Sequence, residues 1–151
     1  DETQVDEGGS ATTCDNFFPG EGCSKTNSYI NQFFQTFWTD IYAESQQIDE
    51  EDLDGIDAFY DKYSDQFVTN YAATNPGEDI AESFSYVMMQ DDIPTGDAIQ
   101  DQKVRFWQDY PEMVSLRQQI RANIDFTFDL DQINAVRAER WNARKLAFQN
   151  N

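Results

Sequence analysis

The chain has 151 residues, with 29 acidic residues against 10 basic ones, and its formal net charge is −19 at pH 7. This length suits one domain with a real core, and an aromatic content of 15% is too high for a disordered acidic tail. The charge excludes nucleic acids and anionic membrane surfaces as partners, because both would repel the chain. No apolar run approaches the roughly 20 residues that cross a bilayer, so no membrane insertion is expected.

The sequence contains no histidine. Histidine is the commonest general base and the commonest metal ligand, so its absence excludes a histidine-based triad and a zinc site held by histidines of this chain alone. The negative charge is uneven, because Lys25 and Lys62 are the basic residues of the segment 1–101. We interpret this acidic excess as a solvated surface, which would also suit a saline habitat because salt screens self-repulsion.

Residues 1–27 are predicted to form an irregular acidic arm, followed by a helical domain over 28–151. Cys14 and Cys23 lie nine positions apart in a stretch rich in glycine, proline, serine and threonine. Two cysteines cannot complete a tetrahedral zinc site without histidine, so we favour a disulfide over two free thiols. A disulfide indicates an oxidising compartment, and we therefore expect an extracellular or cell-surface location, with a signal that this chain does not contain.

The first helix is expected to begin near Asn27 or Ser28, since either residue can cap it. Apolar residues then recur in pairs every four positions over 29–42, which predicts one long helix with a broad apolar face. Its aromatic stripe could line a ligand groove, but aromatic residues at helical spacing are more typical of a core, and we interpret them as core residues. The stripe consists of Phe33, Phe34, Phe37 and Trp38.

A second helix is predicted after the acidic run at 49–52, with an apolar face that extends to Phe67. The next helix has a strong start signal, because Asn75 can cap it and Pro76 fits its first position. Its inward face is predicted to contain Ile80, Ala81, Phe84, Val87 and Met88.

Two further helices are expected on either side of Pro111, the first of them capped by Asp97 after a turn at 94–97. Residues 125–129 are ambiguous between helix and short strand, and a last amphipathic helix is predicted from about Asp131. The fold class that follows is all-α, as a single helical domain of about six helices.

Two glutamates are candidates for a site on the helix that starts at Asn75. Glu78 and Glu82 are one turn apart on the same face, where like charges repel unless a cation lies opposite. A metal ion or a metal-bound histidine would satisfy that requirement. The other interpretation, that both carboxylates point into water, stays open at this point.

The spacing from Tyr71 to Glu78-Asp-Ile-Ala-Glu82 resembles a motif of gluzincin metallopeptidases, the zinc proteases whose first two ligands come from an H-E-x-x-H helix. In several of them a tyrosine lies seven residues before the glutamate that is the third zinc ligand, and Tyr71 lies seven residues before Glu78. The longer run 67–121 resembles the C-terminal half of bacterial zinc metallopeptidases that are commonly exported or lipid-anchored. The resemblance implies a fold similar to the C-terminal helical subdomain of zincins.

The resemblance also implies a role for each of the three residues. Glu78 would be the third zinc ligand, and the hydroxyl of Tyr71 would stabilise the oxyanion of the tetrahedral intermediate. Glu82, one turn after Glu78, would lie behind the metal and orient a ligand histidine.

The chain departs from the family because the two histidines and the general-base glutamate of H-E-x-x-H are absent. The hypothesis is therefore the C-terminal part of a longer secreted zinc metallopeptidase, inactive as this chain. Its partner would be the upstream H-E-x-x-H-containing portion of the same protein, its substrate a peptide or protein, and its zinc would depend on histidines from outside this chain. The alternative is a non-catalytic extracellular helical protein that acts by binding or assembly.

Overall fold

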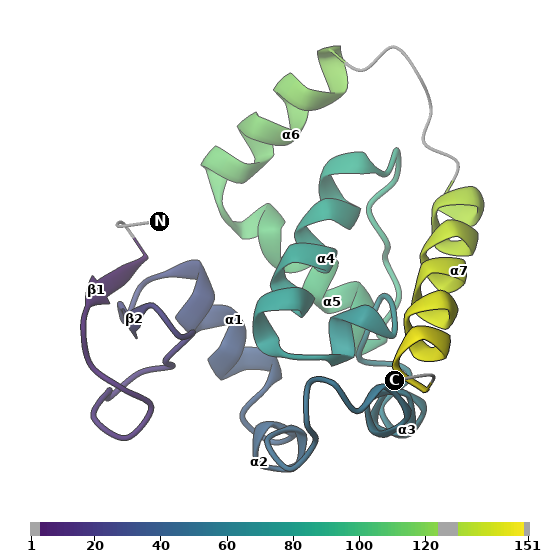
Figure 1. Ribbon diagram of the computed structural model, residues 1–151. Helices are drawn as coiled ribbons and strands as arrows, with labels where there is room; N and C mark the ends of the chain where they lie inside the picture. Colours follow the sequence, from purple (N-terminus) through teal and green to yellow (C-terminus); the bar gives the residue numbers. More distant parts are fainter. Residues whose placement is uncertain (1–3, 124–129, 150–151) are drawn as a thin grey trace.

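The computed structural model describes residues 4–123 and 130–149 (Figure 1). Within them the chain is mostly helical and carries only a small two-stranded sheet, so the predicted all-α fold is confirmed. The elements in chain order are β1 (Val5–Glu7), β2 (Gly22–Ser24), α1 (Tyr29–Phe37), α2 (Tyr42–Ser45), α3 (Leu53–Lys62), η1 (Tyr71–Ala73), α4 (Pro76–Met89), α5 (Ile99–Phe106), η2 (Trp107–Asp109), α6 (Pro111–Asn123) and α7 (Leu130–Gln149), where η marks a 3-10 helix.

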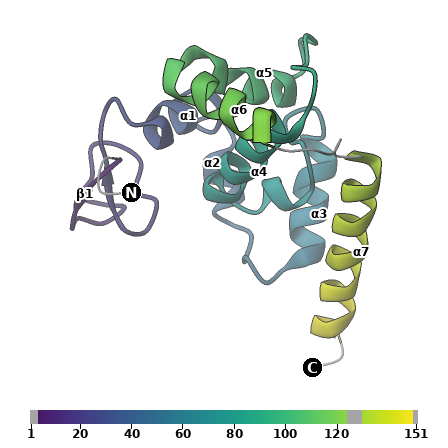
Figure 2. The same ribbon diagram turned by 90° about the horizontal axis from the view of Figure 1, so that it is seen from above.

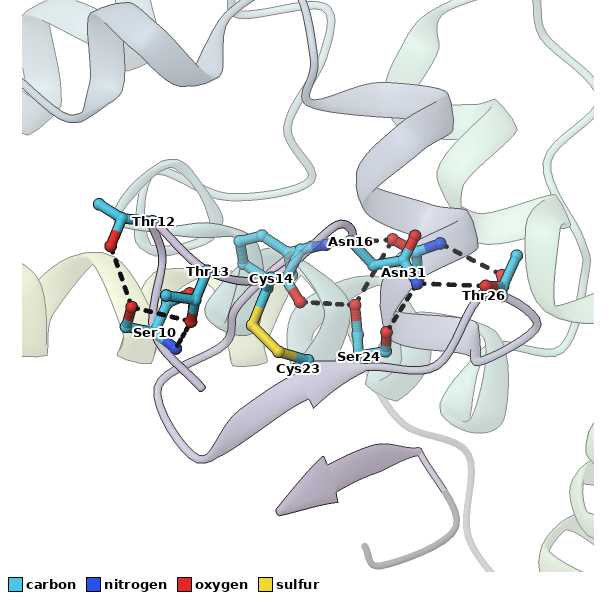
Figure 3. The surroundings of a disulfide bond; sticks show 10 residues. Ser10, Thr12, Thr13, Cys14, Asn16, Cys23, Ser24, Thr26 and Asn31 are labelled. Carbon is cyan, nitrogen blue, oxygen red and sulfur yellow. Dashed lines mark hydrogen bonds between the residues drawn. A yellow bond between two sulfur atoms is a disulfide. The ribbon is translucent and has the colours of Figure 1, made fainter. Parts of the chain in front are cut away.

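The N-terminal arm is largely irregular and contains one small antiparallel sheet. β1 pairs with β2, with Asp6 opposite Cys23. A side chain on Gly22 would collide with the carbonyl of Asp6, so the close pairing depends on glycine there. The predicted disulfide is confirmed, since Cys14 and Cys23 are bonded with a Cα–Cα distance of 5.4 Å (Figure 3).

Asn31 of α1 forms hydrogen bonds that connect the arm to the helical body (Figure 3). The Oδ1 atom of Asn31 accepts hydrogen bonds from the Phe17 amide at 3.3 Å and from the Ser24 hydroxyl at 3.4 Å. Its Nδ2 donates to the carbonyl of Thr26 at 3.2 Å. The ring of Phe17 stacks on Phe34 at 4.1 Å between centroids, so the arm also adds to the core.

Helix α1 starts where it was predicted, because the hydroxyl of Ser28 accepts a hydrogen bond from the Asn31 amide at 3.1 Å. It ends earlier than predicted, at Phe37, and the short α2 follows. Trp38 and Ile41 in the connecting turn are both buried, with exposed fractions of 0% and 4%. The turn therefore places both side chains in the core.

The core is built from the aromatic stripe of α1 and from residues of α3 to η2. The interpretation of the stripe as core is confirmed, because three of its members are buried and Phe37 packs against them. The most enclosed large apolar side chains of the core are Phe33, Trp38, Ile56, Phe67, Val87, Met88 and Val104.

Helix α4 begins at the predicted start signal. Asn75 accepts a hydrogen bond from the Glu78 amide at 3.0 Å, and Pro76 occupies the first turn. Its buried face differs from the predicted one, because Ala81 is exposed while Asp79 and Ser83 are buried. The small polar Ser83 fits there because its hydroxyl accepts a hydrogen bond from the indole N–H of Trp107 at 3.2 Å.

The turn before α5 is stabilised by other residues than the predicted cap. The residue that caps α5 is Ala98, without a side-chain hydrogen bond, so the expected cap at Asp97 was wrong. Side chains of α5 reach back instead: Gln102 donates to the carbonyl of Asp97 at 2.9 Å and Arg105 to the carbonyl of Gly96 at 2.7 Å. Pro111 opens α6, one of the two positions expected for it.

The last helix, α7, lies beside α3, at the opposite end of the molecule from the arm (Figures 1 and 2). It begins at Leu130, close to the predicted start. The ambiguous segment 125–129 lies outside the described residues. No helix in the described part of the chain combines the length and apolar character that a membrane span requires.

Candidate functional site

The three predicted site residues lie on two adjoining elements. Tyr71 is the first residue of η1, and Glu78 and Glu82 lie on α4, a few residues further along. Thr69 ties the two elements together, because its hydroxyl accepts a hydrogen bond from the Ala72 amide at 3.1 Å and donates to Glu82 Oε2 at 3.0 Å. The short connection through Asn75 thus leaves Tyr71 facing the first turns of α4.

Tyr71 and Glu78 are brought together in the structure. The Glu78 carboxylate lies close enough to the Tyr71 hydroxyl to affect its ionisation. The pKa of Tyr71 is raised, first by burial and then by the neighbouring Glu78 carboxylate. The positive charge of Arg144 acts on the same hydroxyl and lowers its pKa. The phenol is therefore held protonated as a donor beside a carboxylate.

Glu82 lies deeper in the same face of α4 and is 9% exposed. Its Oε2 accepts a hydrogen bond from Thr69 and forms an ion pair with Nη1 of Arg137, on α7, at 3.0 Å. The carboxylate is consequently oriented by two groups. The interpretation in which both glutamates simply point into water does not fit Glu82.

A pocket of about 270 Å³ lies between η1, α4 and α7. Tyr71 and Glu82 form one side of it, and residues of α7 form the other. The sequence analysis did not identify the basic wall, because it drew no functional conclusion from the arginines of the last helix. The lining residues are Asn70, Tyr71, Glu82, Arg137, Arg140, Trp141 and Arg144.

Helix α7 is attached beside this pocket mainly by polar contacts to α3. Lys145 pairs with Asp57 at 2.6 Å and with Asp54 at 2.7 Å, and these two hydrogen-bonded carboxylates raise the pKa of the lysine. The indole N–H of Trp141 donates to Asp57 Oδ1 at 2.9 Å. The Trp141 ring meets the ring of Tyr71 edge to face, with 6.2 Å between centroids.

Directly behind the site, α4 is anchored by a buried ion pair that the sequence analysis missed. Lys103 Nζ lies 2.6 Å from Asp79 Oδ2, and both side chains are almost fully enclosed. Trp38 donates to the same oxygen at 2.8 Å, and the ring centroid of Phe67 lies 4.2 Å from the lysine nitrogen. Burial raises the pKa of Asp79 to about 6, and the nearby charge of Lys103 opposes that rise.

A sequence signal for this pair existed. Lys103 lies on the apolar face of α5, four residues from Ile99 and from Trp107. A lysine at that position points into the core and requires a buried anion, which Asp79 supplies. Asp79 and Ser83 face the core, while Glu82 of the same helix lines the pocket.

The described residues could supply one ligand of a zinc site but not a complete set of ligands. Glu78 offers one carboxylate, but no cluster of three or more metal-ligating side chains occurs among the described residues. Zinc in a catalytic site needs three protein ligands, and this sequence has no histidine to supply the others. A zinc centre here would need ligands from outside the chain.

Comparisons of the chain with protein-family models, with curated protein sequences and with solved structures give no match.

Proposed function

We propose that this chain is the C-terminal part of a secreted zinc metallopeptidase and is inactive alone. Glu78 would supply the third metal ligand, Tyr71 would donate its hydroxyl hydrogen bond to the reacting carbonyl oxygen, and Glu82 would orient a ligand histidine. The zinc, held mainly by histidines from outside this chain, would activate the water that cleaves the peptide bond. The disulfide is compatible with the oxidising compartment of a secreted protein.

One observation carries this proposal. The Glu78 carboxylate is near enough to Tyr71 to contribute to its raised pKa, although the residues lie on different elements, and Tyr71 lines a pocket. This proximity supports the proposal, because a gluzincin requires such a tyrosine near its glutamate ligand. Glu82, held by Thr69 and Arg137, adds a fixed carboxylate one turn away.

The test joins the chain to its upstream coding sequence and measures peptide hydrolysis and bound zinc. We expect Glu78→Gln to lower zinc content and abolish activity, and Tyr71→Phe to lower kcat about 100-fold with zinc content unchanged. Glu51→Gln, at an exposed glutamate before α3, is the matched control and should leave both unchanged. Full activity of the Glu78→Gln protein would exclude the proposed role.

A non-catalytic binding or assembly protein is the second candidate, and one observation favours it. Helix α7 covers the face that presents Tyr71 and Glu82, with Trp141 against the tyrosine and Arg137 on the glutamate. An upstream segment that completes a zinc site would have to approach beside α7 or displace it. If the joined protein folds but neither binds zinc nor cleaves peptides, this second function is the better description.

A further inference from the structure

Three arginines of α7 converge on the pocket beside Tyr71. Arg137, Arg140 and Arg144 are spaced by three and four residues, so they form one stripe along the helix, and all three line the pocket. The whole chain has only 10 basic residues. Nearly a third of its positive side chains therefore border one small cavity in an otherwise acidic protein.

This stripe is locally unfavourable without an anion opposite it. Like charges three or four residues apart on a helix repel each other. Arg137 forms an ion pair with Glu82. Within the described part of the chain Arg140 makes no ion pair, and it shares the pocket wall with Glu82, the other arginines and two aromatic rings.

The rest of the lining fits a flat, small anionic group. Trp141 and Tyr71 form an aromatic corner, and the amide of Asn70 is held in place by donating to Asp57 at 3.3 Å. A guanidinium group presents a planar fork of donors that matches the two oxygens of a carboxylate. A volume of about 270 Å³ accommodates such a group with a short side chain or stretch of backbone.

We propose that the pocket between η1, α4 and α7 binds a peptide carboxylate through Arg140 and Arg144. The carboxylate is either the C-terminus of the peptide or an acidic side chain. The choice of a peptide rests on the proposed function, since the pocket shares Tyr71 with the candidate catalytic site; the carboxylate specificity rests on the arginines alone.

The test titrates the isolated chain, without metal, with four short peptides and follows binding by calorimetry. The probes are acetyl-Ala-Leu-Ala with a free C-terminus, the same peptide as its amide, and acetyl-Ala-Glu-Ala-amide with its glutamine counterpart. We expect at least one acid to bind about tenfold or more tightly than its neutral counterpart. Preference for the first pair identifies a C-terminus, and preference for the second an acidic side chain.

Two variants and a matched control locate the site. Arg140→Gln and Arg144→Gln should each weaken binding of the preferred acid about tenfold, because each removes one charge from the pocket. Lys62→Gln removes the same charge from the exposed end of α3 and should leave binding unchanged. Circular dichroism of each variant establishes that the overall helix content is unchanged.

The proposal is overturned if acids and amides bind equally, if no probe binds at millimolar concentration, or if the folded arginine variants bind as the parent chain does. None of these results touches the peptidase proposal, because the titration needs neither zinc nor the upstream segment. Conversely, loss of the peptidase proposal through an active Glu78→Gln protein would leave carboxylate binding intact.

Discussion

The two walls of the candidate site are held by opposite kinds of interaction. Helix α4 is fixed by the core, since Asp79, Ser83, Val87 and Met88 are at most 2% exposed. Helix α7 is held mostly by charges: Lys145 on the aspartates of α3 and Arg137 on Glu82, with Trp141 as the buried apolar anchor. The glutamates proposed for zinc chemistry thus lie on the rigid wall, and the basic residues lie on the wall whose ionic attachment should respond to salt.

The largest effect is expected on the rigid wall, from Lys103→Ala. Removal of the lysine leaves Asp79 in the core without its cation, which should lower the free energy of unfolding by about 3–5 kcal/mol. Urea denaturation measures this loss. Lys62→Ala is the control, because that lysine pairs with Glu44 at the surface, and its effect should be small. Equal effects of the two substitutions would mean that the buried pair does not anchor α4.

A double substitution of Asp79 and Lys103 tests why the stability is lost. Asp79→Leu combined with Lys103→Met substitutes apolar side chains for two buried charges and should recover part of the stability lost in Lys103→Ala, because the buried indole N–H of Trp38 then loses its acceptor. Such recovery would show that the loss comes from an uncompensated carboxylate and not from the missing volume of the lysine.

The next effect concerns the C-terminal end of α4. Arg117 donates to the carbonyls of Val87, Gln90 and Asp91 at 2.7, 2.6 and 2.9 Å. These are carbonyls at and beyond the helix end, where the positive charge also favours the helix dipole. We expect Arg117→Ala to lower the free energy of unfolding by about 1–3 kcal/mol. Gln118→Ala, the exposed neighbour on α6, should change it little, and a similar loss there would assign the effect to α6 itself.

Local sequence signals were sufficient to predict where α1 and α4 begin, which face of α1 is buried and which cysteines are bonded. Ser28 and Asn75 were identified as helix caps because their side chains act on amides three residues away, which a sequence pattern records. The apolar stripe of α1 was recognised as core for the same reason. The disulfide followed from two cysteines in a turn-rich stretch, and the structure confirms it.

The features that depend on distant partners could not be predicted in this way. The position of Lys103 on the apolar face of α5 indicates a buried lysine, but no local signal identifies its partner, because an aspartate alone indicates a surface. Only the contact between α4 and α5 makes Asp79 a core residue. The basic wall of the pocket was missed likewise, because the packing of α7 against η1 and α4 has no local sequence signature. The zinc roles of Glu78, Tyr71 and Glu82 remain predictions.

A smaller effect is expected at the attachment of α7, from Asp57→Asn. The Asp57 carboxylate accepts the indole N–H of Trp141 and pairs with Lys145, so its neutralisation should weaken the contact by about 1 kcal/mol. Hydrogen exchange resolves the two walls: protection of α7 should fall while protection of α4 stays unchanged. Asp61→Asn, on the same helix and exposed, is the control. A parallel loss in α4 would mean that the two helices open as one unit.

The smallest effect is expected from a change in salt concentration. It should change the hydrogen-exchange protection of α4 and α7 in opposite directions. A rise from about 0.01 M to about 1 M salt shortens the Debye length from about 30 Å to about 3 Å. Screening should relieve the self-repulsion of a chain with a net charge of −19, so the core and α4 should keep or gain protection. The same screening weakens the pairs of Lys145 and Arg137 with their carboxylates, so α7 should exchange faster. Hydrogen exchange at both salt concentrations measures the two responses together. If α7 gains protection along with α4, its contact depends on Trp141 and apolar packing more than on charge, and the contrast between the walls is lost.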